Sequence, residues 1–94
     1  AFYLDTQRRL IERRIISVGT LDTSLLHPRE VFEPALQLSA AGVVLAHNHP
    51  SGNLEPSDED IAITKRVAEA GDLLGITLID HIIVSDKDFR VMDS

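Results

Sequence analysis

The chain has 94 residues, which suits one domain with a modest core, and its 44% hydrophobic and 26% charged content is typical of a globular protein. No apolar run reaches the roughly 18–20 residues that a membrane helix needs. The absence of cysteine excludes disulfides and thiolate metal sites and fits a reducing compartment, so we expect a cytoplasmic protein. The net charge of −6 disfavours direct DNA binding by this chain alone, which would rely on clustered Lys and Arg.

The first half of the chain predicts two strands, a helix and a third strand. Residues 2–4 and 10–18 have strand composition, and turn-type residues between them predict a hairpin. The apolar residues of 10–18 do not alternate cleanly, which favours a bulge or burial on both faces. A helix over 28–39 follows, with Pro28 in the first turn, where a missing N–H costs little. The continuous apolar run VVLAH, at 43–47, is typical of a buried strand.

The second half predicts one more helix and two more strands. Ser57 is the expected N-cap, and Asp60 follows three residues later in a capping-box-like pattern. Periodic apolar residues extend this helix to Gly75, a typical stop signal. Strands are predicted over 76–85 and 89–92. The order β-β-α-β-α-β-β indicates an α/β fold in which a mixed sheet packs against helices.

The stretch LAHNHPSGNLEPSDED carries the predicted chemistry. His47 and His49 lie two residues apart, so in an extended backbone both side chains point to the same side. If the following loop folds the next helix over the strand end, Asp60 supplies a third ligand. Two nitrogens and a carboxylate oxygen suit Zn²⁺ and leave a position for water, which such a metal activates as a nucleophile. Ser57 is placed to donate to an oxyanion or to that water.

Each of these residues also has an ordinary structural interpretation. A histidine pair at a strand end can simply face solvent or cap backbone carbonyls. Asp60 alone is favoured at a helix start by the macrodipole, and Ser57 alone is a typical N-cap. His27 is predicted on a surface loop. His81 is predicted in the core, or hydrogen-bonded to a carboxylate or carbonyl in support of the ligands.

Taken together, the residues His47, His49, Pro50, Ser57 and Asp60 spell H-x-H-P-x6-S-x2-D. This pattern resembles the JAMM motif of the MPN-type zinc metalloproteases. The stretches YLD, HPREVF, LAHNHPSGNLEPSDEDI and GITLIDHIIV are similar to the C-terminal domain of the bacterial RadC family, and the similarity covers nearly the whole chain. We therefore expect residues 1–94 to form a single MPN/JAMM-like RadC domain. Because the chain opens directly on strand-like residues, we expect it to be truncated at its N-terminus.

The resemblance implies an α/β/α sandwich of the cytidine-deaminase-like type with a bound zinc. The implied metal ligands are His47, His49 and Asp60, and Ser57 matches the serine that assists the tetrahedral intermediate. The implied activity is hydrolysis of a peptide or isopeptide bond in an unidentified peptide or protein substrate. Catalytic JAMM enzymes also take a general acid–base glutamate from an early strand, which would lie ahead of Ala1. The glutamates that do not match that position are Glu12, Glu30 and Glu33.

Two other functions stay open at this point. A noncatalytic interaction module associated with DNA repair is compatible with the missing glutamate, although the family's repair name does not follow from these residues. A metal-dependent nuclease is disfavoured by the acidic charge, and the contiguous His-Asn-His is not the dispersed nuclease motif of the same letters. A deaminase would need H-x-E and C-x-x-C elements, which the sequence lacks.

Overall fold

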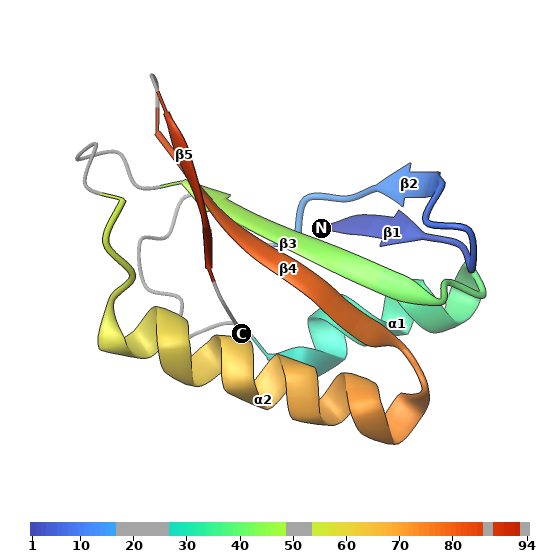
Figure 1. Cartoon of the computed structure of the whole chain (residues 1–94). Coiled ribbons are helices and arrows are strands. Elements are labelled where there is room, and N and C mark those ends of the chain that lie inside the picture. Colours follow the sequence, from blue (N-terminus) through green and yellow to red (C-terminus); the bar gives the residue numbers. More distant parts are fainter. Residues whose placement is uncertain (17–26, 49–53, 86–87, 93–94) are drawn as a thin grey trace.

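The computed structural model describes residues 1–16, 27–48, 54–85 and 88–92 (Figure 1). These residues form, in chain order, β1 (Phe2–Leu4), β2 (Leu10–Arg13), α1 (Pro28–Gln37), β3 (Gly42–Asn48), α2 (Asp58–Leu74), β4 (Thr77–Val84) and β5 (Phe89–Met92). The predicted element order is confirmed.

The strands form one sheet in the order β2-β1-β3-β4-β5. Strands β3 and β4 run parallel and the other pairs are antiparallel, so the predicted mixed α/β sheet is confirmed. Both helices pack against the same face of this sheet, and the described residues thus show one helical layer of the sandwich (Figure 1). Within the described ranges, neither helix combines the length and apolarity needed to cross a membrane.

The core lies between the two helices and that face of the sheet. Its buried apolar side chains are Tyr3, Val31, Phe32, Ala35, Ala40, Val43, Leu45, Ile63, Val67, Ile76 and Leu78. The Tyr3 hydroxyl donates a 2.6 Å hydrogen bond to the carbonyl oxygen of Val31, which ties β1 to α1. Burial raises the pKa of Tyr3 to about 12, because the phenolate would lose its hydration.

The helix predicted over 28–39 ends two residues early. Gln37 is the last helical residue and Leu38 is the C-cap. Ser39 has a φ of 52°, in the left-handed region, which an α-helix cannot continue through. The helix therefore stops before Gly42, where β3 begins.

The strand predicted over 10–18 is also shorter, because β2 ends at Arg13 and residues 14–16 do not continue it. The predicted residues 17–18 lie outside the described ranges. Tyr3 pairs with Glu12 and Leu4 with Leu10, which leaves one extra residue in β2. Of the two alternatives predicted for this segment, a bulge or burial on both faces, the bulge is present.

A second irregularity lies in β4 and decides which of its side chains face the helices. Val43 pairs with Leu78, whereas Val44 pairs with Asp80, so Ile79 is an extra residue in β4. A bulge shifts the alternation of side chains between the two faces of a sheet. As a result, His81 lies on the same buried face as Leu78, with only 3% of its surface exposed.

Helix α2 ends at Gly75, the predicted stop, which adopts the left-handed conformation with a φ of 73°. One turn earlier, α2 makes a very close approach to the chain that leads into β4. A Cβ built on Gly71 would lie 2.2 Å from the carbonyl oxygen of Ile76 and 3.1 Å from the ring of Phe32. Position 71 is therefore restricted to glycine by backbone contact.

We predict that Gly71→Ala destabilises the domain by about 3 kcal/mol, the upper end of the cost of overpacking, despite the better helix propensity of alanine. Gly75→Ala is the matched control, because a Cβ there meets nothing within 4 Å and only the left-handed backbone is strained. We expect Gly75→Ala to cost about 1 kcal/mol. Denaturant unfolding measures both variants, and equal losses would contradict the close approach.

Candidate metal centre

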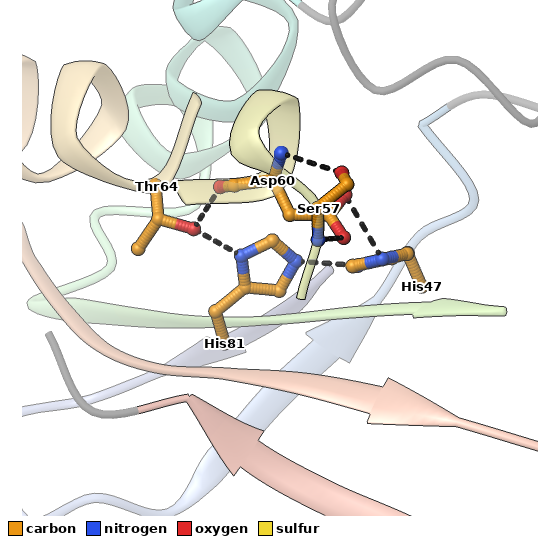
Figure 2. A network of polar contacts seen from close by, with 5 residues as sticks. All are labelled: His47, Ser57, Asp60, Thr64 and His81. Carbon is orange, nitrogen blue, oxygen red and sulfur yellow. Dashed lines mark hydrogen bonds and ion pairs between the residues drawn. The ribbon is translucent and has the colours of Figure 1, made fainter. Parts of the chain in front are cut away.

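His47 lies near the end of β3, on the strand face that packs against the helices. Val43 and Leu45, which share its face by alternation, are buried in the core. The His47 side chain keeps 17% of its surface exposed. The start of α2 lies next to it, so that residues of the helix N-terminus point toward the imidazole ring (Figure 2).

A reciprocal capping box begins α2. The backbone N–H of Asp60 donates to the Ser57 hydroxyl oxygen at 3.0 Å, and the backbone N–H of Ser57 donates to Asp60 Oδ2 at 2.9 Å. Both N–H groups belong to the helix start, where no intrahelical acceptor is available. The capping-box prediction is confirmed, with aspartate in the place of the usual glutamate. The box fixes the direction of the Asp60 carboxylate.

The second carboxylate oxygen of Asp60 faces His47. The distance between Asp60 Oδ1 and His47 Nε2 is 3.3 Å. Asp60 is only 1% exposed, and a buried carboxylate is costly unless it is paired and hydrogen-bonded. The Ser57 N–H, which donates to Oδ2, and the positive end of the helix dipole offset part of this cost. Among the described residues, every buried polar side-chain atom has a hydrogen-bond partner.

Two further side chains extend the network behind His47 (Figure 2). The Thr64 hydroxyl donates to the carbonyl oxygen of Asp60 at 2.7 Å, and its oxygen lies 2.5 Å from His81 Nδ1. His81 Nε2 lies 2.6 Å from His47 Nδ1. The two imidazole rings meet edge to face, with centroids 4.7 Å apart and planes inclined at 61°. The network thus runs from β3 through β4 to α2.

Four site residues were predicted from the sequence, and the structure brings three of them together. These three are His47, Ser57 and Asp60. His49 lies outside the described residues, and those residues contain no group of three side chains able to hold a metal. The pair that is described, an imidazole nitrogen and a carboxylate oxygen, has the donor chemistry of a zinc site.

Sequence reasoning missed Thr64. It lies four residues after Asp60, on the same face of α2, and that spacing was a usable signal. The prediction that His81 is buried is confirmed, but the partners in this network are a hydroxyl and an imidazole rather than a carboxylate or carbonyl.

The three glutamates that did not match the catalytic position lie elsewhere. Glu12, in β2, forms an ion pair with Arg14, which follows that strand. Glu30 and Glu33 project from α1 and line a surface hollow together with Arg14. The lining of that hollow contains no residue of the network around Asp60.

The mixed sheet, with a histidine and an aspartate converging at a strand end and a helix start, is consistent with a JAB/MPN-type α/β domain. A family model described as a RadC-like JAB domain matches residues 1–93. The chain belongs to this RadC-like JAB domain family.

The chain is also similar to curated proteins from several organisms. The chain is 58% identical over 90 residues to a UPF0758 protein of Rubrobacter xylanophilus, covering 96% of this chain and 40% of that protein. It is 49% identical over 94 residues to one of Desulforamulus reducens, covering 100% of this chain and 41% of that protein. It is 51% identical over 86 residues to one of Methanococcoides burtonii, covering 92% and 38%. The chain therefore spans about 40% of the length of these curated relatives.

The capping box predicts a simple pattern of stabilities at position 57. Ser57→Ala removes the acceptor for the Asp60 N–H and should lower the free energy of unfolding by about 1 kcal/mol. Ser57→Asn supplies an alternative side-chain oxygen and should restore most of that loss. Denaturant unfolding of the three proteins measures the effect, and an asparagine variant as unstable as the alanine variant would contradict the cap.

Proposed function

We propose that this domain is a zinc-dependent hydrolase of the metallopeptidase or isopeptidase type. The observation that carries the proposal is the convergence of His47 Nε2 and Asp60 Oδ1, 3.3 Å apart at the edge of the core. An imidazole nitrogen and a carboxylate oxygen are both groups that bind zinc, and in this chain the pair belongs to an H-x-H-P-x6-S-x2-D pattern within a JAB-type domain.

In this proposal, His47, His49 and Asp60 hold the zinc. His49 joins the set because it follows His47 by two residues in the sequence. Bound zinc supplies Lewis acidity to a substrate carbonyl and to a water molecule. The capping box holds Asp60 in place through its other oxygen, so the ligand does not depend on the metal for its orientation.

Ser57 has the chemistry for a second role beside capping. Its oxygen accepts the Asp60 N–H, which uses a lone pair and leaves the hydroxyl hydrogen available to donate. A donor beside the metal pair is suited to stabilise the negative charge that develops on a substrate carbonyl oxygen. Capping and catalysis by Ser57 are therefore compatible.

We propose a peptide or protein substrate rather than DNA, since the net charge of −6 opposes contact with a phosphate backbone. The alternative is a noncatalytic interaction module that retains the fold. It is favoured by one observation: Glu12 pairs with Arg14, and the hollow that Glu30 and Glu33 line contains no residue of the network around Asp60.

The metal assignment predicts about one zinc per chain. His47→Ala and His49→Ala should each abolish stoichiometric binding, because each removes one of three ligands. His27→Ala is the matched control: this histidine is exposed at the start of α1 and should leave the zinc content unchanged. Elemental analysis after dialysis, with circular dichroism to verify folding, measures the four proteins. Full zinc retention in folded His47→Ala would refute the assignment.

The catalytic role of Ser57 predicts a difference between two substitutions that both keep the fold. Ser57→Asn, which retains a cap, should lower turnover by roughly 10²–10³-fold, the cost of losing one oxyanion donor. Ser57→Thr retains the hydroxyl and should keep most of the activity. Because the chain spans about 40% of its relatives' length, the assay requires the whole protein and a panel of fluorogenic peptide and isopeptide substrates. Equal turnover of the wild type and the Ser57→Asn variant would contradict the catalytic role and would show that Ser57 only caps the helix.

A further inference from the structure

The donor and acceptor of each hydrogen bond between Thr64, His81 and His47 can be assigned, starting from Thr64. A threonine hydroxyl has one hydrogen, and the carbonyl oxygen of Asp60 can only accept. The 2.7 Å contact between them therefore uses the Thr64 hydrogen. The 2.5 Å contact between Thr64 Oγ1 and His81 must then run the other way, with His81 Nδ1–H as the donor.

A hydrogen on His81 Nδ1 determines which nitrogen donates in the contact between His81 and His47. In a neutral imidazole only one nitrogen carries a hydrogen, so a His81 ring protonated on Nδ1 has a lone pair on Nε2. At 2.6 Å from that lone pair, His47 Nδ1 must donate. A neutral His47 protonated on Nδ1 has its own lone pair on Nε2, the nitrogen that lies 3.3 Å from Asp60 Oδ1.

We propose that Thr64 and His81 are positioning residues that hold His47 with its hydrogen on Nδ1 and thereby make Nε2 the metal-binding atom. This inference rests on the proposed function, in which His47 is a zinc ligand. The spacing of the histidines alone does not select between the two ring nitrogens of His47. The contacts from α2 and β4 select Nε2.

We call the series of contacts from Thr64 through His81 to His47 the relay. It begins and ends at Asp60. Thr64 is anchored on the backbone carbonyl of Asp60, and His47 Nε2 faces the side-chain carboxylate of the same Asp60. The orientation of the histidine ligand is thus coupled to the position of the carboxylate ligand. Thr64 and His81 are 5% and 3% exposed, and hydrogen bonds shielded from water to this degree are electrostatically stronger than exposed ones.

The test is the identity of the protonated nitrogen in each ring, read from ¹H–¹⁵N correlation spectra of the imidazoles in the 94-residue chain. In the zinc-loaded wild type we expect hydrogen on Nδ1 of both His47 and His81, with the zinc on His47 Nε2. Zinc bound through His47 Nδ1, or hydrogen on His81 Nε2 instead of Nδ1, would overturn the relay.

Substitution of Thr64 tests the coupling. Thr64→Val keeps the shape but removes the acceptor, so His81 is no longer held with its hydrogen on Nδ1. We expect zinc affinity, measured by competition with a chelator, to fall about 10–100-fold, the usual effect of losing a group that supports a metal ligand. Thr64→Ser should restore the affinity, and Thr77→Val, at an exposed position on β4, should leave it unchanged. Unchanged affinity and nitrogen assignments in Thr64→Val would refute the relay.

Failure of this inference differs from failure of the proposed function. A wild-type chain that binds no zinc would refute the proposed zinc hydrolase. The metal-free spectra of that chain would still test the relay, because the Thr64 contact requires hydrogen on His81 Nδ1 with or without metal. Stoichiometric zinc bound through the wrong nitrogen of His47 would instead refute the relay and retain the zinc site.

Discussion

The buried carboxylate of Asp60 is the group on which the geometry of the site depends. One of its oxygens accepts the Ser57 N–H, and the other faces His47 Nε2. Its backbone also takes part, since its N–H donates to Ser57 and its carbonyl accepts from Thr64. The residue that completes the capping box of α2 is therefore also the residue that presents an oxygen to His47, and a change in the helix start would displace that oxygen.

The sheet supplies the other half of the site. Strands β3 and β4 are parallel, and α/β proteins commonly place their ligands where parallel strands end. His47 lies at that end of β3, whereas His81 reaches the same buried face because Ile79 is an extra residue in β4. Without this bulge, alternation from Leu78 would turn His81 to the opposite face and remove the support of His47.

Much of this arrangement could be predicted from sequence, because it depends on local rules. The capping box of Ser57 and Asp60, and the stop at Gly75, follow from residue type and spacing. The bulge at Ile79 could not be predicted, because it is set by pairing with β3 more than thirty residues away. The spacing from Asp60 indicates the face of α2 that carries Thr64, but the contact of Thr64 with His81 could not be predicted, since a hydroxyl on α2 meets β4 only after the helix packs on the sheet.

The most direct test of the central claim is a crystal structure of the zinc-soaked chain, with anomalous data collected on both sides of the zinc absorption edge. The account predicts one anomalous peak per chain, at about 2.0–2.2 Å from His47 Nε2, from an Asp60 carboxylate oxygen and from a ring nitrogen of His49. The Asp60 oxygen bonded to Ser57 should keep that bond. An anomalous peak located away from His47 and Asp60, or a zinc ion bound to His47 Nδ1 instead of Nε2, would contradict the account.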